Sequence, residues 1–421
     1  MDAVDDRWYR DAVVYELSVR TFADENGDGV GDFRGLTRRL DYLEGLGATA
    51  IWLLPFQPSP GRDDGYDISN HYGVDPAYGD LGDFVRFVEH ARDRGMRVLI
   101  DLVLNHTSDE HPWFQAARAG DEKLRDYYVW SPERPPDAEK GVVFPGVQKS
   151  TWSYDRTAKR WYFHRFYDFQ PDLNIANPAV RDEMEKIIGF WLNLGISGFR
   201  VDAVPFLIEP VSATNTSPSP EFDWLHGFRS YLSWRSGSAV LLGEANVERE
   251  QVTDYFGVGG MHMLFNFEAN QHLWLAFARE EAAPLADALR DTAGIPGADR
   301  WATFLRNNDE LDLGADARPR PPSDRARVLA AVLAPRHAGA VLRRRDRDGR
   351  RPVPAGAQRG PDADAVVERA ERRLLDRAAN AVRPAGRRAR RLRVSTGERG
   401  RPVPRSLVAP ALRAPRRTGP A

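Results

Sequence analysis

Seven short segments of the chain are almost continuously apolar, and each is followed by a stretch with the spacing of an amphipathic helix. Strands that are covered on both faces need apolar residues at nearly every position, so this pattern predicts buried parallel strands. Helices are expected between them, for example over residues 81–94 and 179–194. The predicted strands are residues 12–19, 48–54, 97–104, 198–204, 239–244, 263–267 and 301–305.

The order of these elements predicts the fold class. Strands that alternate with helices form parallel sheets. Seven such strands within about 300 residues favour an α/β barrel of the TIM type, (β/α)8, that is one strand short, over an open sheet. The long segment between the third and fourth strands is rich in Trp, Tyr, Phe and Pro. We expect it to form a small inserted domain at the mouth of the barrel.

The character of the chain changes near residue 315. The remaining residues contain no Phe, Trp, Tyr, Lys, Ile or Met, and about a quarter of them are Arg. Such a segment lacks the side chains for a core, so disorder is expected. The predicted domains are two barrel segments, residues 1–106 and 179–314, an inserted domain over residues 107–178, and an Arg/Ala/Pro-rich tail over residues 315–421.

Composition excludes several kinds of chemistry. The 421 residues carry a formal net charge of −2 and contain no cysteine, which excludes disulfides, thiolate metal sites and cysteine nucleophiles. No apolar run is long enough to span a bilayer, and the acidic N-terminal residues are unlike a secretory signal. We expect a cytoplasmic protein with no membrane or nucleic-acid partner, although the Arg runs of the tail leave a nucleic-acid tail as an alternative.

Charged residues stand at the carboxyl ends of the predicted strands, where barrel enzymes assemble their chemistry. Arg200 and Asp202 lie two positions apart, so their side chains point to the same side of the strand. Arg200 would keep Asp202 ionised, and a purely structural ion pair is the alternative. Other predicted strands end in further polar residues: Asp101, Asn105, His106, Glu244 and Asp309.

Carboxylates on separate strand ends suit the chemistry of glycosidic bonds. One carboxylate attacks the anomeric carbon, while another protonates the leaving oxygen and later activates the acceptor. Tyr66 offers an aromatic face for a sugar ring, although a lone Tyr more often belongs to a core. The neighbouring residues Asp63, Asp64 and Asp67 predict a polar, exposed loop around it.

Four segments, DLVLNH (101–106), GFRVDAV (198–204), LLGEAN (241–246) and FLRNNDE (304–310), resemble in order and spacing the regions shared by the α-amylase superfamily, glycoside hydrolase family 13. QPDLN (170–174) is similar to a fifth region. The resemblance covers roughly residues 7–314. It implies an eight-stranded barrel with a domain inserted after strand three.

The same resemblance implies roles for individual residues. Asp202 would be the nucleophile of a retaining mechanism, Glu244 the acid/base and Asp309 the stabiliser of the transition state. The sugar in the −1 subsite would be held by Arg200, His106, Asp64, Tyr66 and Asn308.

Within the superfamily, residues 8–33, 52–68, 103–114 and 164–174 are most similar to the trehalose synthases, which isomerise maltose to trehalose in a closed pocket. This implies α-glucosyl transfer, with maltose or another α-glucoside as the small-molecule substrate and no organic cofactor. Hydrolysis of the α-glucosidase, oligo-1,6-glucosidase or α-amylase type is one alternative. An inactive, truncated pseudoenzyme is another.

Residues 24–32, DENGDGVGD, place oxygen atoms at alternate positions, as a hard cation requires. Position twelve of an EF-hand would be Gly35, so the bidentate glutamate is absent. A matching loop binds calcium in related barrel enzymes, which implies a structural calcium ion here; a turn without an ion is the alternative. The implied ligands are Asp24, Asn26, Asp28, the Val30 carbonyl and Asp32.

The chain departs from the family pattern in two places. Asn308 stands where the family has a histidine, and it cannot carry a positive charge, so weaker transition-state binding is expected. After residue 314, neither strand eight nor a C-terminal β-domain is recognisable. A barrel without strand eight would leave two strand edges unpaired, so poor folding is expected.

The tail itself suggests how the second departure arose. PRHAGAVLRRRDR (335–347) is the peptide obtained when GC-rich codons for the family-like LPGTPVLFYGDEIG are read one base early. DADAVV (362–367) is related to RTPMQWS in the same way. We therefore expect a frameshift between about residues 312 and 325.

Overall fold

The structure, a computed structural model, describes residues 7–308 apart from residues 145, 217, 258, 280 and 296–299. Asp309 and the Arg-rich tail therefore lie outside the described residues. The described residues all belong to one compact unit. None of the helices in this part is long and apolar enough to cross a membrane.

The main sheet contains all seven predicted strands, and all neighbouring strands in it are parallel. Its strand order follows the chain order, as in a barrel. The strands curl into a half-barrel, so the prediction of a TIM-type fold is confirmed. The strands are β1 (Val14–Leu17), β2 (Ala50–Leu53), β3 (Arg97–Leu102), β7 (Gly198–Val201), β8 (Val240–Gly243), β9 (Met263–Phe265) and β10 (Trp301–Ala302).

Alternate residues along the strands face two different environments. Tyr15 and Leu17 of β1 pack in the layer between the strands and the helices. Val14 of the same strand and Trp52 of β2 belong instead to the apolar cluster inside the barrel. Because side chains alternate with a period of two, Glu16 points toward the barrel interior, as Val14 does.

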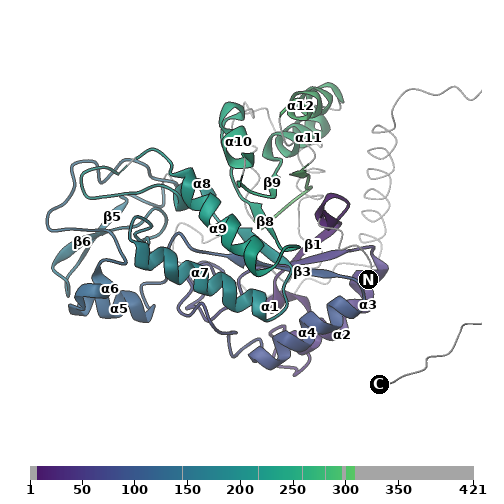
Figure 1. Cartoon of the computed structure of the whole chain (residues 1–421), viewed down its shortest axis with the longest axis horizontal. Coiled ribbons are helices and arrows are strands. Elements are labelled where there is room, and N and C mark those ends of the chain that lie inside the picture. Colours follow the sequence, from purple (N-terminus) through teal and green to yellow (C-terminus); the bar gives the residue numbers. More distant parts are fainter. Residues whose placement is uncertain are drawn as a thin grey trace, which may run out of the picture. The chain divides into compact units, whose positions relative to one another are not determined.

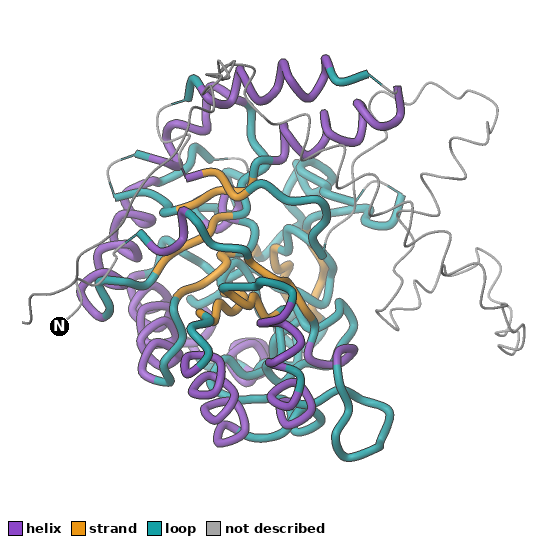
Figure 2. The backbone as a smooth tube through the Cα atoms, turned by 90° about the vertical axis from the view of Figure 1, so that its right-hand side faces the viewer, coloured by secondary structure: helices purple, strands orange, loops and turns teal. Residues whose placement is uncertain are grey.

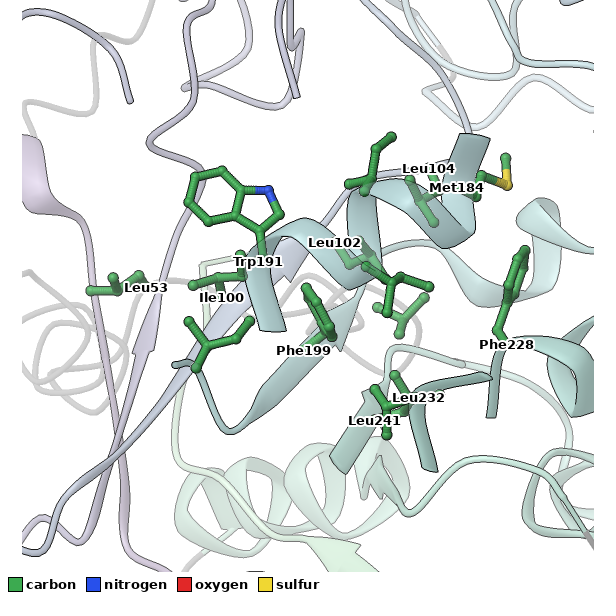
Figure 3. Packing of buried hydrophobic residues seen from close by; sticks show 14 of the residues in the cluster. Leu53, Ile100, Leu102, Leu104, Met184, Trp191, Phe199, Phe228, Leu232 and Leu241 are labelled. Atoms are coloured by element: carbon green, nitrogen blue, oxygen red, sulfur yellow. The ribbon is translucent and has the colours of Figure 1, made fainter. Parts of the chain in front are cut away.

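Helices surround the strands of the main sheet (Figure 2). Trp191 of α7 packs edge-on against Phe56 and Phe84, and Figure 3 shows it in the same cluster as Ile100 and Phe199 of the sheet. The helices are η1 (Trp8–Arg10), α1 (Val19–Phe22), α2 (Phe33–Arg38), α3 (Leu40–Gly45), α4 (Leu81–Asp93), α7 (Pro178–Asn193), α8 (Val204–Leu207), α9 (Phe222–Arg235), α10 (Arg249–Phe256), α11 (Phe267–Arg279) and α12 (Ala283–Ala293).

The sequence marks where two of the long helices begin. Asp80 and Asp83 form a reciprocal capping box at the start of α4. Asn177 caps α7, whose first residue is Pro178. Both arrangements satisfy backbone N–H groups that the first turn of a helix leaves free. The helices predicted over residues 81–94 and 179–194 are found within one residue of their expected bounds.

The segment between β3 and β7 contains a second, antiparallel sheet in the order β4-β6-β5. It lies with α5 and α6 at the left of Figure 1. A backbone hydrogen bond of 2.9 Å from Leu173 to Asn105 joins the end of this segment to the end of β3. The limits predicted for an inserted domain, residues 107 and 178, stay a prediction. The elements are α5 (Pro112–Ala119), α6 (Glu122–Arg125), β4 (Trp130–Ser131), β5 (Trp152–Asp155) and β6 (Arg160–Phe163).

Candidate active site

Arg200 of β7 is the centre of a buried charge cluster. Its neighbours on the strand belong to the outer core, so Arg200 points into the barrel, where only 1% of its side chain is exposed. Nη1 of Arg200 lies 2.6 Å from Oδ1 of Asp101 and 2.6 Å from Oδ1 of Asp202. Nη2 lies 2.7 Å from Oε1 of Glu244. One guanidinium group therefore holds three carboxylates from the neighbouring strands β3, β7 and β8.

Asp101 links this cluster to aromatic side chains. Its Oδ2 accepts hydrogen bonds from Nε1 of Trp52 at 3.0 Å and from the hydroxyl of Tyr66 at 3.2 Å. The guanidinium carbon of Arg200 lies 5.3 Å from the Trp52 ring and 5.8 Å from the Tyr66 ring, within cation–π range. Burial raises the pKa of Asp101, and Arg200 opposes that shift. The guanidinium group is thus fixed by hydrogen bonds and by ring faces.

Asp202 follows the last residue of β7 and is 8% exposed. Burial raises the pKa of Asp202, and the ion pair with Arg200 works in the opposite direction. The next residue, Ala203, has a φ of 49°, in the left-handed region that residues with a side chain rarely adopt. Its backbone N–H donates to Oε2 of Glu244 at 3.0 Å. The turn that carries Asp202 therefore also orients Glu244.

The two carboxylates predicted to be catalytic are brought together by shared donors. Each carboxylate of the pair receives an N–H of Arg200, and Glu244 also receives the N–H of the residue that follows Asp202. Such a pair can divide the roles of nucleophile and acid/base. Asp309, the third predicted carboxylate, lies outside the described residues.

Four of the predicted sugar-binding residues gather beside this pair. The Tyr66 hydroxyl accepts hydrogen bonds from Nη1 of Arg200 at 3.3 Å and from Nδ2 of Asn308 at 2.7 Å. Nε2 of His106 lies 3.2 Å from the Tyr66 carbonyl oxygen. Burial lowers the pKa of His106 to about 4, so its ring is neutral at pH 7. Asp64, the fifth residue, lies in the same loop with a φ of 47° and is exposed.

The loop around Tyr66 is less exposed than its sequence predicts. Asp67 is completely buried, with a relative exposure of 0%. It accepts hydrogen bonds from the Ser59 hydroxyl at 2.8 Å and from the backbone N–H groups of Arg62 and Asp63, each at 3.2 Å. The prediction was wrong for Asp67 because the loop folds back on this carboxylate and supplies its hydrogen-bond donors.

Two side chains, that of Arg62, which the sequence did not single out, and that of Gln170 in the QPDLN segment, fasten the same loop to the segment between β3 and β7. The Arg62 side chain pairs with Asp109 and lies 4.5 Å over the ring of Phe169. Nε2 of Gln170 donates to Oδ2 of Asp63 at 2.8 Å. Both contacts fix the part of the loop that directly precedes Tyr66.

The loop predicted to bind calcium is organised by hydrogen bonds within itself. The two oxygens of Asp24 accept the N–H groups of Gly27 and Gly29, each at 2.7 Å. Those of Asp32 accept the N–H groups of Glu25 at 2.9 Å and Gly35 at 2.7 Å. Each carboxylate oxygen has a second lone pair, so the donor set still suits a hard cation. Within the described residues, no three His, Cys, Asp or Glu side chains are grouped as a metal site, and calcium stays a prediction.

Carboxylates that cluster at the carboxyl ends of parallel barrel strands define an enzyme site of the TIM-barrel class, and a carboxylate pair is what glycosidic chemistry uses. The family model described as the alpha amylase catalytic domain matches residues 17–308. The chain belongs to the α-amylase family.

Several relatives resemble it over the same part. A trehalose synthase from Thermus thermophilus is 46% identical over 314 residues, which are 74% of this chain and 32% of that protein. A probable alpha-glucosidase from Rhizobium meliloti is 46% identical over 336 residues, 72% of this chain and 60% of that protein. The structure of the trehalulose synthase MutB from Pseudomonas mesoacidophila MX-45 has a TM-score of 0.63 at 32% identity, covering 74% of this chain and 60% of that one. The chain spans less than two thirds of the length of each.

Proposed function

We propose that the protein is a retaining α-glucosyl-transferring enzyme that isomerises maltose to trehalose, with Asp202 as nucleophile and Glu244 as acid/base. The observation that carries the proposal is the guanidinium group of Arg200, whose Nη1 binds Asp202 and whose Nη2 binds Glu244. The trehalose synthases among the relatives support isomerisation, and the alpha-glucosidase supports hydrolysis as the second candidate.

The first half of the reaction forms a covalent intermediate. The carboxylate of Asp202 attacks the anomeric carbon of the non-reducing glucosyl unit of maltose, and the bond from that carbon to the glycosidic oxygen breaks. Glu244 transfers its proton to this oxygen, which releases glucose. The positive charge of Arg200 stabilises the ionised form of Asp202 before the attack. Neutral His106 and the Tyr66 hydroxyl provide polar contacts at the site.

The second half returns the enzyme to its starting state. Glu244, now ionised, removes the proton of the anomeric hydroxyl of the released glucose, and that oxygen attacks the glucosyl carbon. The bond to Asp202 breaks, and the new bond joins the two anomeric carbons, as in trehalose. Water in place of the released glucose would give hydrolysis. We assign Asp309 the stabilisation of both transition states, from the resemblance of FLRNNDE to the fourth family region.

The test is an incubation of the purified full chain with maltose, followed by separation of trehalose from glucose. Trehalose is expected as the main product, with none from the variant Glu244→Gln. The matched control is Glu183→Gln, which changes a carboxylate on α7 that is paired with Lys186. Glucose as the sole product would favour the hydrolase, and no turnover by a folded chain would favour an inactive relative.

We further propose a structural calcium ion in the loop from Asp24 to Asp32 and a cytoplasmic location, with no nucleic-acid or membrane partner. The five oxygen donors of the loop support the calcium ion, since they suit a hard cation. Cell fractionation tests the location, and retention on DNA at low salt tests the predicted absence of a nucleic-acid partner.

A further inference from the structure

Glu16 is a buried carboxyl group that the proposed mechanism does not use. It lies on β1, opposite Trp52 in the register with β2, and it faces the barrel interior. Its Oε1 is buried and has no hydrogen-bond partner among the described residues. The backbone N–H of Asn308 donates to this carboxyl group. Such an unpaired oxygen is costly if the group is ionised.

The charged groups that face Glu16 come from the neighbouring elements of the barrel. They are Asp101 on β3, Arg200 on β7 and Glu244 after β8. Asp202 belongs to the same cluster through its bond to Arg200. Together with Glu16 there are four carboxyl groups around one guanidinium group. Glu244 holds the proton that it transfers in the proposed mechanism. The three remaining carboxyl groups cannot all be ionised at such close range around one guanidinium group, so one of them must hold a second proton.

The hydrogen bonds indicate which group holds it. Asp101 and Asp202 each receive an N–H of Arg200, at 2.6 Å in both cases. Charge-assisted bonds of this kind favour the ionised form of a carboxylate. Glu16 receives none of these N–H groups.

We propose that Glu16 holds a proton at neutral pH and is a positioning residue for the active site. Its neutral carboxyl group leaves the positive charge of Arg200 to the ionised carboxylates of Asp101 and Asp202. Ionisation of Glu16 would add a third negative charge and draw Arg200 away from Asp202 and Glu244. In agreement with this geometry, burial and then Asp101 raise the pKa of Glu16 to about 8.

Infrared difference spectroscopy on the full chain tests where the proton is, independently of catalysis. The carbonyl band of a protonated carboxyl group is separate from the carboxylate bands. At about pH 6.5, where ordinary glutamates are ionised, wild type minus Glu16→Gln should show the protonated band. That band should disappear with a midpoint near 8. Carboxyl labelling of glutamate with ¹³C should move the band, and labelling of aspartate should not.

The matched control is Glu209→Gln, which changes a partly buried carboxyl group that is paired with Arg165. This variant should keep the Glu16 band. If the band survives in Glu16→Gln and is lost in Asp202→Asn, the proton belongs to Asp202 and the proposal is overturned. If Glu16→Gln does not fold, labelled Glu244→Gln decides, because it lacks the proton of the acid: a protonated band that moves only with aspartate labelling also overturns the proposal.

The effect on turnover rests on the proposed function. In the wild type, kcat for maltose should be halved near the pH at which half of Glu16 is ionised, about 8. Glu16→Gln should lose this component of the alkaline decline, whereas Glu209→Gln should keep it. An alkaline decline that is identical in wild type and Glu16→Gln would overturn the positioning role, even where the infrared result holds. A folded chain without any turnover would refute the proposed function and leave the infrared result standing.

Discussion

Replacement of Arg200 by methionine would remove the positive charge that three buried carboxylates share and keep most of the side-chain volume. The guanidinium group lies within 2.7 Å of Asp101, Asp202 and Glu244. The matched control is Arg34→Met, because Arg34 also pairs with a carboxylate, Asp83, at 2.8 Å but is 67% exposed. Both variants lose one arginine, and only the first leaves buried charges without a partner.

The loss of stability can be estimated from the proton that Asp101 must bind when the variant folds. Asp101 has a side-chain exposure of 0% and cannot remain ionised without Arg200. Protonation of an ordinary aspartate, with a pKa of about 3.9, costs about 4 kcal/mol at pH 7 and about 1.5 kcal/mol at pH 5. We therefore expect Arg200→Met to lower the free energy of unfolding by about 4 kcal/mol at pH 7, in the range known for broken buried ion pairs. Because the pKa of Asp101 is raised in the folded variant, the loss of unfolding free energy grows as the pH rises from about 4 to 7.

Urea denaturation of wild type, Arg200→Met and Arg34→Met at pH 5 and pH 7 measures these differences. Arg34→Met should differ little from wild type at either pH, since Arg34 is exposed and the buried Asp83 keeps its pair with Arg86. If Arg200→Met loses as little unfolding free energy as Arg34→Met, the three buried carboxylates do not depend on Arg200 for their charge. A large loss that is the same at both pH values would show lost packing rather than unpaired charge.

Three further changes test other parts of the site. Tyr66→Phe removes a hydroxyl that contacts Asp101, Arg200 and Asn308, so kcat/KM for maltose should fall by about tenfold; an unchanged value would show that the hydroxyl is dispensable. Asn308→His restores a side chain that can carry charge, and turnover should rise; no rise in kcat would contradict the role given to this position. Calcium at about 100 times its Kd should raise the free energy of unfolding by about 2.7 kcal/mol and should do so much less in Asp28→Ala. Thermal melts with calcium and with a chelator measure this, and coincident melts would leave the loop as a turn without an ion.

The strands and helices of the described part could be predicted because their signals are local. Continuous apolar runs identified the seven parallel strands. Asp80 and Asn177, which cap two of the helices, are of residue types that favour the N-cap position. The pairing of Arg200 with Asp202 could also be predicted, because it depends only on a spacing of two along a strand.

The rest of the site depends on contacts between distant parts of the chain. Asn308 meets Tyr66 across 242 positions, and Trp52 meets Asp101 across 49. A tryptophan in an apolar strand is normally a core residue, so nothing in the sequence assigned Trp52 to the charge cluster. Asp67 was misjudged because exposure of a loop carboxylate depends on how the loop folds back. Glu16 and Asp101 each interrupt an otherwise apolar strand, which is the local signal that could have pointed to this cluster.

In the proposed mechanism, Asp202 carries the glucosyl group. The most direct measurement is mass spectrometry of the protein after incubation with 5-fluoro-α-glucosyl fluoride, which forms the covalent intermediate faster than it is released. One fluoroglucosyl group is expected on the peptide that contains Asp202, and none in Asp202→Asn. A label on another carboxylate, or an unlabelled protein that nevertheless consumes maltose, would contradict it.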